Sequence, residues 1–251
     1  MKAYAVVKPS AAKRLIAKGV AAHPLVERAL REGTIVITLG TTNAFVAAEL
    51  TGEPIDHGAF AAGLIDDRWN LNARLGEAQD LILRNGKAIS IPSDELLESL
   101  GAGDIIVKGG NAIDPFGVVG VLMAAPTGGT IGRYLPTALA RGIDVLIPIS
   151  VAKSVHASIV DLASELGSRR MSMGDGLPCG LFPLTGCLMT EIEALDTLFS
   201  VRATHVASGG VGTGRGSVSL VFDGEEDDVS NAYAFLRRLS DEPEVPVQGR
   251  S

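Results

Sequence analysis

The order of hydrophobic and polar positions near the N-terminus predicts two short helices, then a strand, a polar turn and a third helix. Ser10 precedes the first helical pattern as a candidate N-cap, and Pro24 stands where the second begins. Residues 34–39 (TIVITL) form a short β-branched run between two glycines, which is typical of a strand buried on both faces. A Gly/Thr-rich turn at 40–43 and an Ala-rich helical pattern at 44–50 follow. The first clear unit is therefore a strand, a turn and a helix.

The centre of the chain repeats this order. We predict strands at 104–108, 118–125 and 144–149, a helix from 127 to 141, and a further helix at 153–166. Strands that alternate with helices in this way require right-handed crossovers and form an open, mostly parallel sheet. The pattern thus favours an α/β fold, with a Rossmann-like, mostly parallel sheet in residues 1–173.

The segment between these two units carries local signals. Residues 58–65 indicate a weak strand. Asn85 and Gly86 separate two apolar runs, and both residues tolerate the positive φ of a type I′ hairpin turn. Ser93 is a candidate cap for the helical pattern at 94–100.

From Pro178 the pattern changes to that of a smaller unit, and we place the boundary between residues 174 and 180. It predicts a strand at 181–189, a helix at 191–199 capped by Thr190, a hairpin of 201–208 with 217–222, and a helix at 227–239. This β-α-β-β-α order is that of the split ferredoxin-like arrangement, with residues 244–247 as a candidate last strand. We therefore predict a C-terminal ferredoxin-like α+β domain with a frayed tail in residues 174–251.

Composition narrows the class of protein. Of the 251 residues 46% are hydrophobic, which provides enough burial to offset the entropy of folding and argues against a disordered chain. The net charge of -7 argues against nucleic-acid binding, although a few N–H groups and one Lys or Arg can still hold a small anion. The longest uncharged run, residues 115–132, contains Pro126 and five glycines, so we expect no membrane span. The N-terminal residues lack the long apolar stretch of a signal peptide, and we expect a cytoplasmic protein.

The strongest candidate site is the turn at 127–132, between a predicted strand and a predicted helix. Glycines, hydroxyl groups and a helix N-terminus together would offer free N–H groups and a positive dipole end to an anion. The alternative is that the glycines only permit a tight turn and close packing of the helix. The candidate binding residues here are Thr127, Gly128, Gly129, Thr130 and Gly132.

Two more turns follow predicted strands, at the positions where open α/β sheets bind ligands. In the first, Thr42 or Asn43 could instead only cap the next helix. The second offers an acid/base pair, with an ordinary surface salt bridge as the alternative. The candidate binding residues are Gly40, Thr41, Thr42, Asn43, Gly109, Gly110 and Asn111, and the candidate catalytic residues are Lys108 and Asp114.

Other chemistry-bearing residues give weaker signals. Adjacent acids on a strand point to opposite faces, so Asp66-Asp67-Arg68 is more simply a solvated loop than a carboxylate pair. The glycine-rich stretch 209–216 lies between two strands and indicates a hairpin lid, whose Arg215 either reaches a phosphate or stays in solvent. The four histidines and two cysteines show no metal-ligand spacing, and no nucleotide-binding fingerprint is present, so we expect neither metal nor cofactor.

The order of these turns is similar to that of a known superfamily. The series VITLGTTNAFVAAEL, DIIVKGGNAID, APTGGTIG and VLIPISVAKSV resembles the superfamily that unites ribose-5-phosphate isomerase, glucosamine-6-phosphate deaminase and the CoA transferases. The resemblance covers residues 33–155, and the predicted C-terminal domain resembles the small domain of that isomerase. What it implies is a phosphate-contacting turn at Gly40, Thr41 and Thr42, a glycine-rich turn at Gly128, Gly129 and Gly132, and a strand-end lysine at Lys153.

The sequence differs from the pattern of the superfamily at the acidic turn. The two leading catalytic aspartates of the isomerase fall at Lys108 and Asn111, and only Asp114 keeps a carboxylate. A glutamate in the glycine-flanked setting of a CoA transferase is also absent from the sequence.

The resemblance implies an enzyme that acts on a small phosphorylated or CoA-linked metabolite, isomerase-like or transferase-like, with Asp114 or Lys108 as the proton handler. The alternative is a non-catalytic binding or sensor protein that kept the anion-binding turns and lost the acids. A third hypothesis is that the C-terminal domain mediates homo-oligomers. The first two require that the three turns meet in space.

Overall fold

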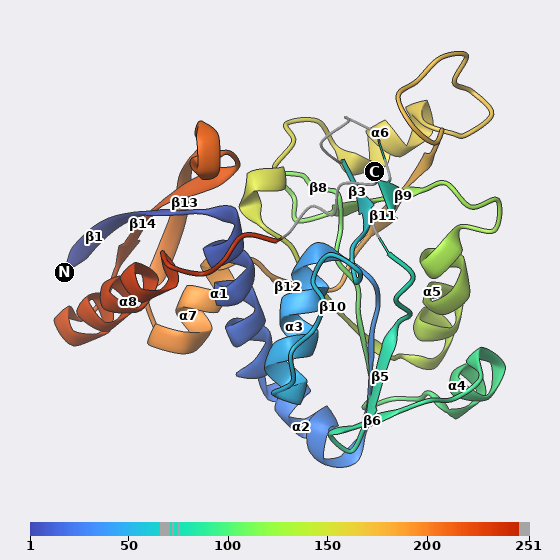
Figure 1. Ribbon diagram of the computed structural model, residues 1–251, viewed down its shortest axis with the longest axis horizontal. Coiled ribbons are helices and arrows are strands. Elements are labelled where there is room, and N and C mark those ends of the chain that lie inside the picture. The colour runs from blue at the N-terminus through green and yellow to red at the C-terminus, as the bar shows by residue number, and fades with distance from the viewer. Residues whose placement is uncertain (66–70, 72, 75, 246–251) are drawn as a thin grey trace.

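The computed structural model describes residues 1–65, 71, 73–74 and 76–245 (Figure 1). Its largest sheet has six strands in the order β12-β10-β7-β2-β5-β6. The four parallel strands are β12 (Cys187–Met189), β10 (Asp144–Pro148), β7 (Ile105–Val107) and β2 (Thr34–Ile37). The antiparallel edge consists of β5 (Leu81–Arg84) and β6 (Lys87–Ile89). The expected α/β protein with a mostly parallel sheet is confirmed.

Helices cover both faces of this sheet (Figure 1). One face carries α1 (Pro9–Ala21), α2 (Pro24–Glu32) and α3 (Thr41–Thr51), and the other carries α4 (Ser93–Ser99) and α5 (Gly129–Arg141). Strand β2 is buried at every position because Ile35 and Ile37 pack into the first core and Val36 packs into the second. A continuous apolar run is therefore the pattern that such a central strand requires.

Several local predictions are confirmed and three are wrong. Asn85 (φ 50°) and Gly86 (φ 73°) both adopt positive φ in the β5–β6 turn, and Thr190 caps α7 (Glu191–Phe199) in a capping box. Neither Ser10 nor Ser93 is an N-cap, because Ser10 is the second residue of α1, whose N-cap is Lys8, and Ser93 is the first residue of α4. The helix expected at 153–166 begins only at α6 (Ile159–Glu165), after the short 3-10 helix η1 (Val151–Lys153).

A small antiparallel sheet lies beside the large one. Strand β9 (Val119–Met123) is its middle strand, between β8 (Ala112–Ile113) and β11 (Gly180–Leu184). The single strand predicted at 181–189 is therefore wrong, since β11 belongs here and β12 belongs to the large sheet. Gly186 lies between them, where a Cβ atom would come within 2.4 Å of the Val145 carbonyl oxygen. A separate two-stranded pair consists of β3 (Ala62–Leu64) and β4 (Ala73–Arg74).

The C-terminal antiparallel sheet has the order β1-β14-β13. It consists of β1 (Lys2–Val7), β14 (Ser217–Asp223) and β13 (Arg202–Gly209), and it packs with α7 and α8 (Glu226–Leu239). The prediction that residues 181–189 supply the first strand of a ferredoxin-like unit is wrong, because the N-terminal β1 pairs with β14 in that place. Glu244 and Val245 form no strand, and residues 246–251 lie outside the described residues.

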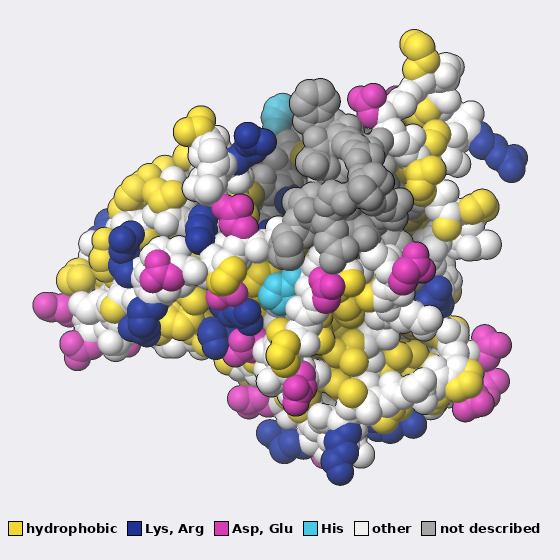
Figure 2. Space-filling view, in the orientation of Figure 1, with side chains coloured by type: hydrophobic (Ala, Val, Ile, Leu, Met, Phe, Trp, Pro, Cys, Tyr) yellow, Lys and Arg dark blue, Asp and Glu magenta, His cyan; other side chains and the backbone are white. Residues whose placement is uncertain are grey.

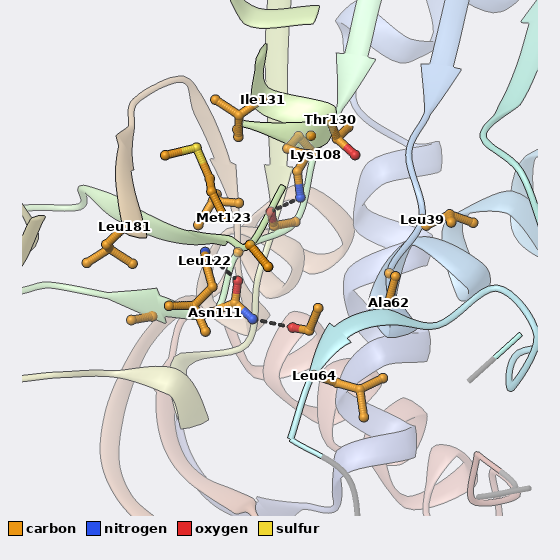
Figure 3. A pocket seen from close by; sticks show the side chains of 18 of the residues that line it. Leu39, Ala62, Leu64, Lys108, Asn111, Leu122, Met123, Thr130, Ile131 and Leu181 are labelled. Atoms are coloured by element: carbon orange, nitrogen blue, oxygen red, sulfur yellow. Dashed lines mark hydrogen bonds between the residues drawn. The ribbon is translucent and has the colours of Figure 1, made fainter. Parts of the chain in front are cut away.

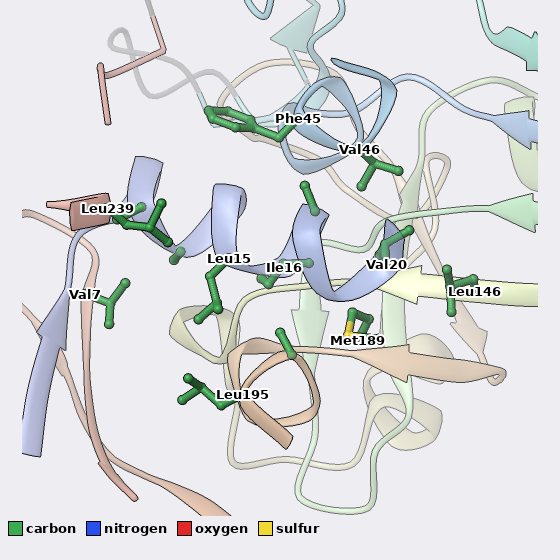
Figure 4. Close-up of a cluster of buried hydrophobic side chains, with 14 of the residues drawn as sticks. Val7, Leu15, Ile16, Val20, Phe45, Val46, Leu146, Met189, Leu195 and Leu239 are labelled. Carbon is green, nitrogen blue, oxygen red and sulfur yellow. The ribbon is translucent and has the colours of Figure 1, made fainter. Parts of the chain in front are cut away.

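Helix α1 lies at the centre of the largest core. Figure 4 shows Leu15 and Ile16 of this helix between Phe45 of α3 and Leu195 of α7. A Cβ atom at Gly19 would lie 2.7 Å from the Ala194 Cβ, so glycine permits the close approach of α1 and α7. The predicted division at residues 173/174 therefore separates segments that share one hydrophobic core.

Charged side chains of both signs are interspersed on the face seen in Figure 2. Arg14 pairs with Glu49 (3.4 Å) and with Glu242 (2.9 Å), which ties α1 to α3 and to the segment after α8. Among the described residues, no helix combines the length and the apolar character needed to cross a bilayer.

Candidate functional site

A cavity of about 760 Å³ lies where the ends of β2, β7 and β10 face the small sheet of β8, β9 and β11 (Figure 3). This volume is in the usual range of small-molecule sites. The predicted residues that line it are Gly40, Thr41, Thr42, Asn43, Lys108, Gly109, Gly110, Asn111, Gly128, Gly129, Thr130 and Lys153. Thr127, Gly132 and Asp114 do not line it. All three predicted turns meet at this cavity.

Helix α3 begins at the cavity with open N–H groups. Gly40 occupies its N-cap position, and the N–H of Gly40 donates to the Phe60 carbonyl oxygen (2.9 Å). No side chain caps the helix, so the alternative that Thr42 or Asn43 serves as its cap is wrong. Within the described part of the chain, no acceptor bonds the N–H groups of Thr41, Thr42 or Asn43. These groups remain open to a ligand.

Helix α5 presents a second open N-terminus to the same cavity. Gly128 at its N-cap (φ 81°) and Gly129 (φ 56°) have positive φ, so these glycines also serve the tight turn, as the alternative interpretation required. The N–H groups of Gly129, Thr130 and Ile131 bond no acceptor among the residues that the structure describes. Two positive dipole ends at one cavity favour an anion between them.

Lys108 follows the buried strand β7 and extends into the cavity (Figure 3). Its Nζ donates a hydrogen bond to the Gly109 carbonyl oxygen (3.0 Å). Burial disfavours the ammonium form and lowers the pKa of Lys108 to about 8, against the opposing attraction of Asp80.

Lys153 follows β10 at the same end of the cavity. Its Nζ donates to the Gly110 carbonyl oxygen (2.6 Å). Burial lowers the pKa of Lys153 to about 8, the positive charges of Lys13 and Lys108 lower it further, and Glu191 acts in the opposite direction. A bound anion would relieve the repulsion among these ammonium groups.

Asn111 connects two walls of the cavity. Its Nδ2 donates to the Gly63 carbonyl oxygen, and its Oδ1 accepts from the N–H of Leu122 (3.0 Å; Figure 3). Both ends of the amide are thus used to tie the β3 segment to β9.

Asn43 is fully buried below the start of α3. Its Nδ2 donates to the carbonyl oxygens of Thr38 (2.8 Å) and Val107 (3.2 Å), which ties α3 to the ends of β2 and β7. Its Oδ1 is buried and has no hydrogen-bond partner among the described residues. Leaving a buried amide oxygen without a hydrogen bond costs free energy.

Asp114 does not reach the cavity, where a proton handler would have to lie. Its Oδ1 accepts from the N–H groups of Phe116 and Val118, and its Oδ2 accepts from that of Ile159, each at 2.9 Å. Burial alone would raise the pKa of Asp114, but the three N–H donors stabilise the carboxylate and hold the pKa below its usual value. Asp114 therefore joins its own loop to the start of α6.

Thr127 and Gly132 shape the turn before α5 and do not line the cavity. Thr127 is exposed. A Cβ atom at Gly132 would lie 1.8 Å from the Thr127 carbonyl oxygen, so glycine is needed there for packing. At Gly132 the alternative interpretation therefore holds: the glycine permits close packing of the helix.

Sequence reasoning missed Asp80, which joins two cavity walls. Its Oδ1 accepts from the N–H of Leu39 (3.1 Å), and its Oδ2 accepts from the Tyr134 hydroxyl (2.9 Å) and from Arg133 (3.2 Å). The turn after β2 is thereby held against α5. In the sequence Asp80 only precedes the apolar run 81–83, so no motif signals this role.

Glu191 is a second missed carboxylate. It is fully buried, accepts from the Ser150 hydroxyl (2.5 Å) and from the N–H of Val151 (2.9 Å), and so fixes η1, which carries Lys153. Burial raises the pKa of Glu191. The sequence shows Glu191 only as an ordinary first-turn acid of a helix.

Of the two weaker loop candidates, the structure describes only the glycine-rich loop. Asp66-Asp67-Arg68 lies outside the described residues. The loop at 209–216 holds the short 3-10 helix η2 (Gly212–Gly214), and Arg215 does not line the cavity. In the described ranges, no three His, Cys, Asp or Glu side chains come together as metal ligands.

Comparisons with protein-family models, with curated proteins and with solved structures gave no match for this chain. The likeness to the isomerase and CoA-transferase superfamily therefore rests on the order of the turns. The cavity is the feature from which a function can be inferred.

Proposed function

We propose that the cavity binds a small phosphorylated or CoA-linked metabolite and that the protein is an enzyme with isomerase-like or transferase-like activity. One observation carries this proposal. Two open helix N-termini and two lysine ammonium groups converge on the cavity, and the described residues that line it include no carboxylate. Open N–H groups, helix dipoles and ammonium groups are the partners that phosphate oxygens prefer.

We also propose to which fold families the two larger sheets belong. The six-stranded sheet would be a Rossmann-like core of the isomerase and CoA-transferase superfamily, and the β1-β14-β13 sheet with α7 and α8 a ferredoxin-like unit begun by β1. Two observations support this assignment. The cavity lies at the carboxyl ends of parallel strands, as in other open α/β sheets, and Gly40, Lys108 and Lys153 follow these strands in the order that the resemblance implies.

Lys108 is the proton handler in this proposal. A lysine whose pKa is about 8 is partly neutral near that pH, and its neutral Nζ can accept a proton from a hydroxyl-bearing carbon and return it to the neighbouring carbonyl carbon, while the hydroxyl proton moves to the carbonyl oxygen. Covalent CoA transfer needs a nucleophilic carboxylate, and the described lining offers none. Lys108 in the cavity therefore supports isomerase-like chemistry.

A non-catalytic binding or sensor protein is the second candidate. Asp114 favours it, because the one carboxylate that the resemblance assigns to the catalytic turn is bonded to backbone N–H groups away from the cavity. The two candidates differ in deuterium exchange. An enzyme of this kind exchanges a carbon-bound proton of a bound sugar phosphate or acyl-CoA with D₂O, whereas a sensor does not.

The anion site can be tested by Thr130→Asp. A carboxylate in the first turn stabilises α5 through its dipole but repels a phosphate at the same point, so phosphate should no longer raise the melting temperature. Differential scanning fluorimetry over a phosphate titration measures this.

Thr127→Asp is the matched control, because Thr127 precedes the same helix, is exposed and does not line the cavity. It should keep the phosphate-dependent rise in melting temperature of the wild type. An equal rise in Thr130→Asp would overturn the proposed anion site.

A further inference from the structure

The walls of the cavity differ in chemistry. Lys108 and Thr130 lie at the polar end, and Figure 3 shows Leu122, Met123 and Leu181 on one side of the cavity. Leu162 in the middle of α6 and Leu166 at its C-cap line it as well. These residues form an apolar wall from β9, β11 and α6.

Most side chains of this apolar wall are only partly covered by other protein atoms. Leu122, Met123, Leu162 and Leu166 are half-buried, in contrast to the fully buried leucines of the two cores. Because they line the cavity, water in the cavity contacts apolar surface. A ligand that covers this surface gains the free energy of releasing that water, and a wholly polar ligand does not.

The apolar wall offers few hydrogen-bond donors or acceptors to a ligand that is rich in hydroxyl groups. The side-chain amide of Asn111 is already bonded at both its nitrogen and its oxygen, and the leucine and methionine side chains of the wall offer no donor or acceptor for a hydroxyl group. Sugar hydroxyls laid against leucine side chains would lose their hydrogen bonds to water without replacement.

We propose that the ligand of this cavity is an amphipathic anion, with a phosphate group at the helix N-termini and an alkyl, acyl or aryl group against β9, β11 and α6. This inference rests on the proposed function, because it requires the anion site. The cavity of about 760 Å³ has room for both parts, since sites of this size hold ligands far larger than a phosphate ion.

A homologous series of n-alkyl phosphates, from methyl to hexyl, tests the inference on the full chain by isothermal titration calorimetry. Each added methylene should tighten binding about fourfold until the apolar wall is covered. Ribose 5-phosphate should bind more weakly than hexyl phosphate.

Leu162→Gln should reduce the gain per methylene and leave the affinity for inorganic phosphate unchanged. Val160→Gln is the matched control, because Val160 is on the same helix, is 57% exposed and does not line the cavity. The series in the wild-type protein decides the question even if Leu162→Gln does not fold.

The outcomes separate the two proposals. Equal affinities for methyl and hexyl phosphate, or tighter binding of ribose 5-phosphate, would overturn the amphipathic ligand and leave the anion site standing. Binding of 1-hexanol as tight as that of hexyl phosphate would overturn the anion site instead. Absence of binding across the whole series would overturn both.

Discussion

Lys108 shows how one residue couples burial to charge in this cavity. Its folded-state pKa, about 8, lies below the value of 10.5 for an unburied lysine. Between these two values the unfolded chain binds more protons than the folded chain, so the contribution of Lys108 to stability rises with pH across this window. Below pH 8 the folded protein carries a poorly solvated ammonium group, which an anionic ligand stabilises.

Anion affinity should therefore fall as the pH rises above about 8, because the lysines lose the charge that a phosphate requires. A phosphate monoester, whose second pKa is about 6, stays dianionic over this range. Lys108→Met should bind ethyl phosphate about tenfold more weakly at pH 7, from the loss of one charge-assisted hydrogen bond, and should lose less affinity between pH 7 and pH 10. Calorimetric titration across this range measures both effects.

Lys87→Met is the control for this variant, because Lys87 is exposed on the edge strand β6 and does not line the cavity. Its affinity profile should match that of the wild type. A profile for Lys108→Met that also matched would show that Lys108 makes no contact with the anion.

At the residue scale, the sequence identifies the turns better than the roles of the side chains in them. Glycines and threonines after a strand are visible in the chain, and those turns do line the cavity. The role of Asp114 is not visible, because one of its three donors is the N–H of Ile159, 45 residues away. Asp80 and Glu191 carry no local signal, since their bonds depend on packing between distant segments.

At the scale of an element, α5 depends on the geometry of the turn before it. Gly128 needs its positive φ, and Gly132 allows the Thr127 carbonyl oxygen to approach the helix. The same turn orients the open N–H groups at the cavity. Packing and anion binding therefore share one structural requirement here.

Gly132→Ala should destabilise the protein by about 1–3 kcal/mol, because its Cβ would lie 1.8 Å from a backbone oxygen and the turn would have to move. Phosphate affinity should fall with it. Urea denaturation and a phosphate titration measure the two effects.

Gly101→Ala is the matched control, since nothing lies within 4 Å of a Cβ atom there. It should change stability by less than about 0.5 kcal/mol. Comparable stability and phosphate affinity in both variants would refute the close contact at Gly132.

The local pattern predicts whether a segment is a helix or a strand, but it does not predict which strands pair with each other. Periodicity reports which side of a segment is buried, and it says nothing about which strand lies beside it. Strand β9 was expected within the large sheet, yet its neighbours are β8 and β11. The segment 181–189 appeared as one strand because its apolar run continues through the point where the chain passes from one sheet to another.

At the scale of the whole molecule, the N-terminal strand completes a sheet formed near the other end of the chain. Strand β1 pairs with β14 along six residues, from Lys2 opposite Asp223 to Val7 opposite Val218. Val7 is 3% exposed and belongs to the core that also contains α1 and α3. The stability of the C-terminal unit is thus tied to that of the large sheet.

Val7→Thr should lower the free energy of unfolding by about 1–3 kcal/mol, because its hydroxyl would be buried without a partner. The effect should appear in a single cooperative transition, since the two parts share one core. Chemical denaturation followed by far-UV circular dichroism measures it.

Val6→Thr is the control, because the adjacent Val6 is 60% exposed on the other face of the same strand. It should be close to neutral. Equal destabilisation by the two substitutions would mean that β1 does not bury Val7 while it exposes Val6.

The pairing of β1 with β14 sets the order of events during synthesis on the ribosome. At 5–20 residues per second, β1 waits roughly 10–40 s for its partner, because Lys2 faces Asp223. Throughout that interval its backbone is an unpaired edge, the kind of surface that invites aggregation and that chaperones shield. The nascent chain can close its second sheet only after β14 has been synthesised, so every prematurely terminated product that ends before residue 217 carries a strand with no partner.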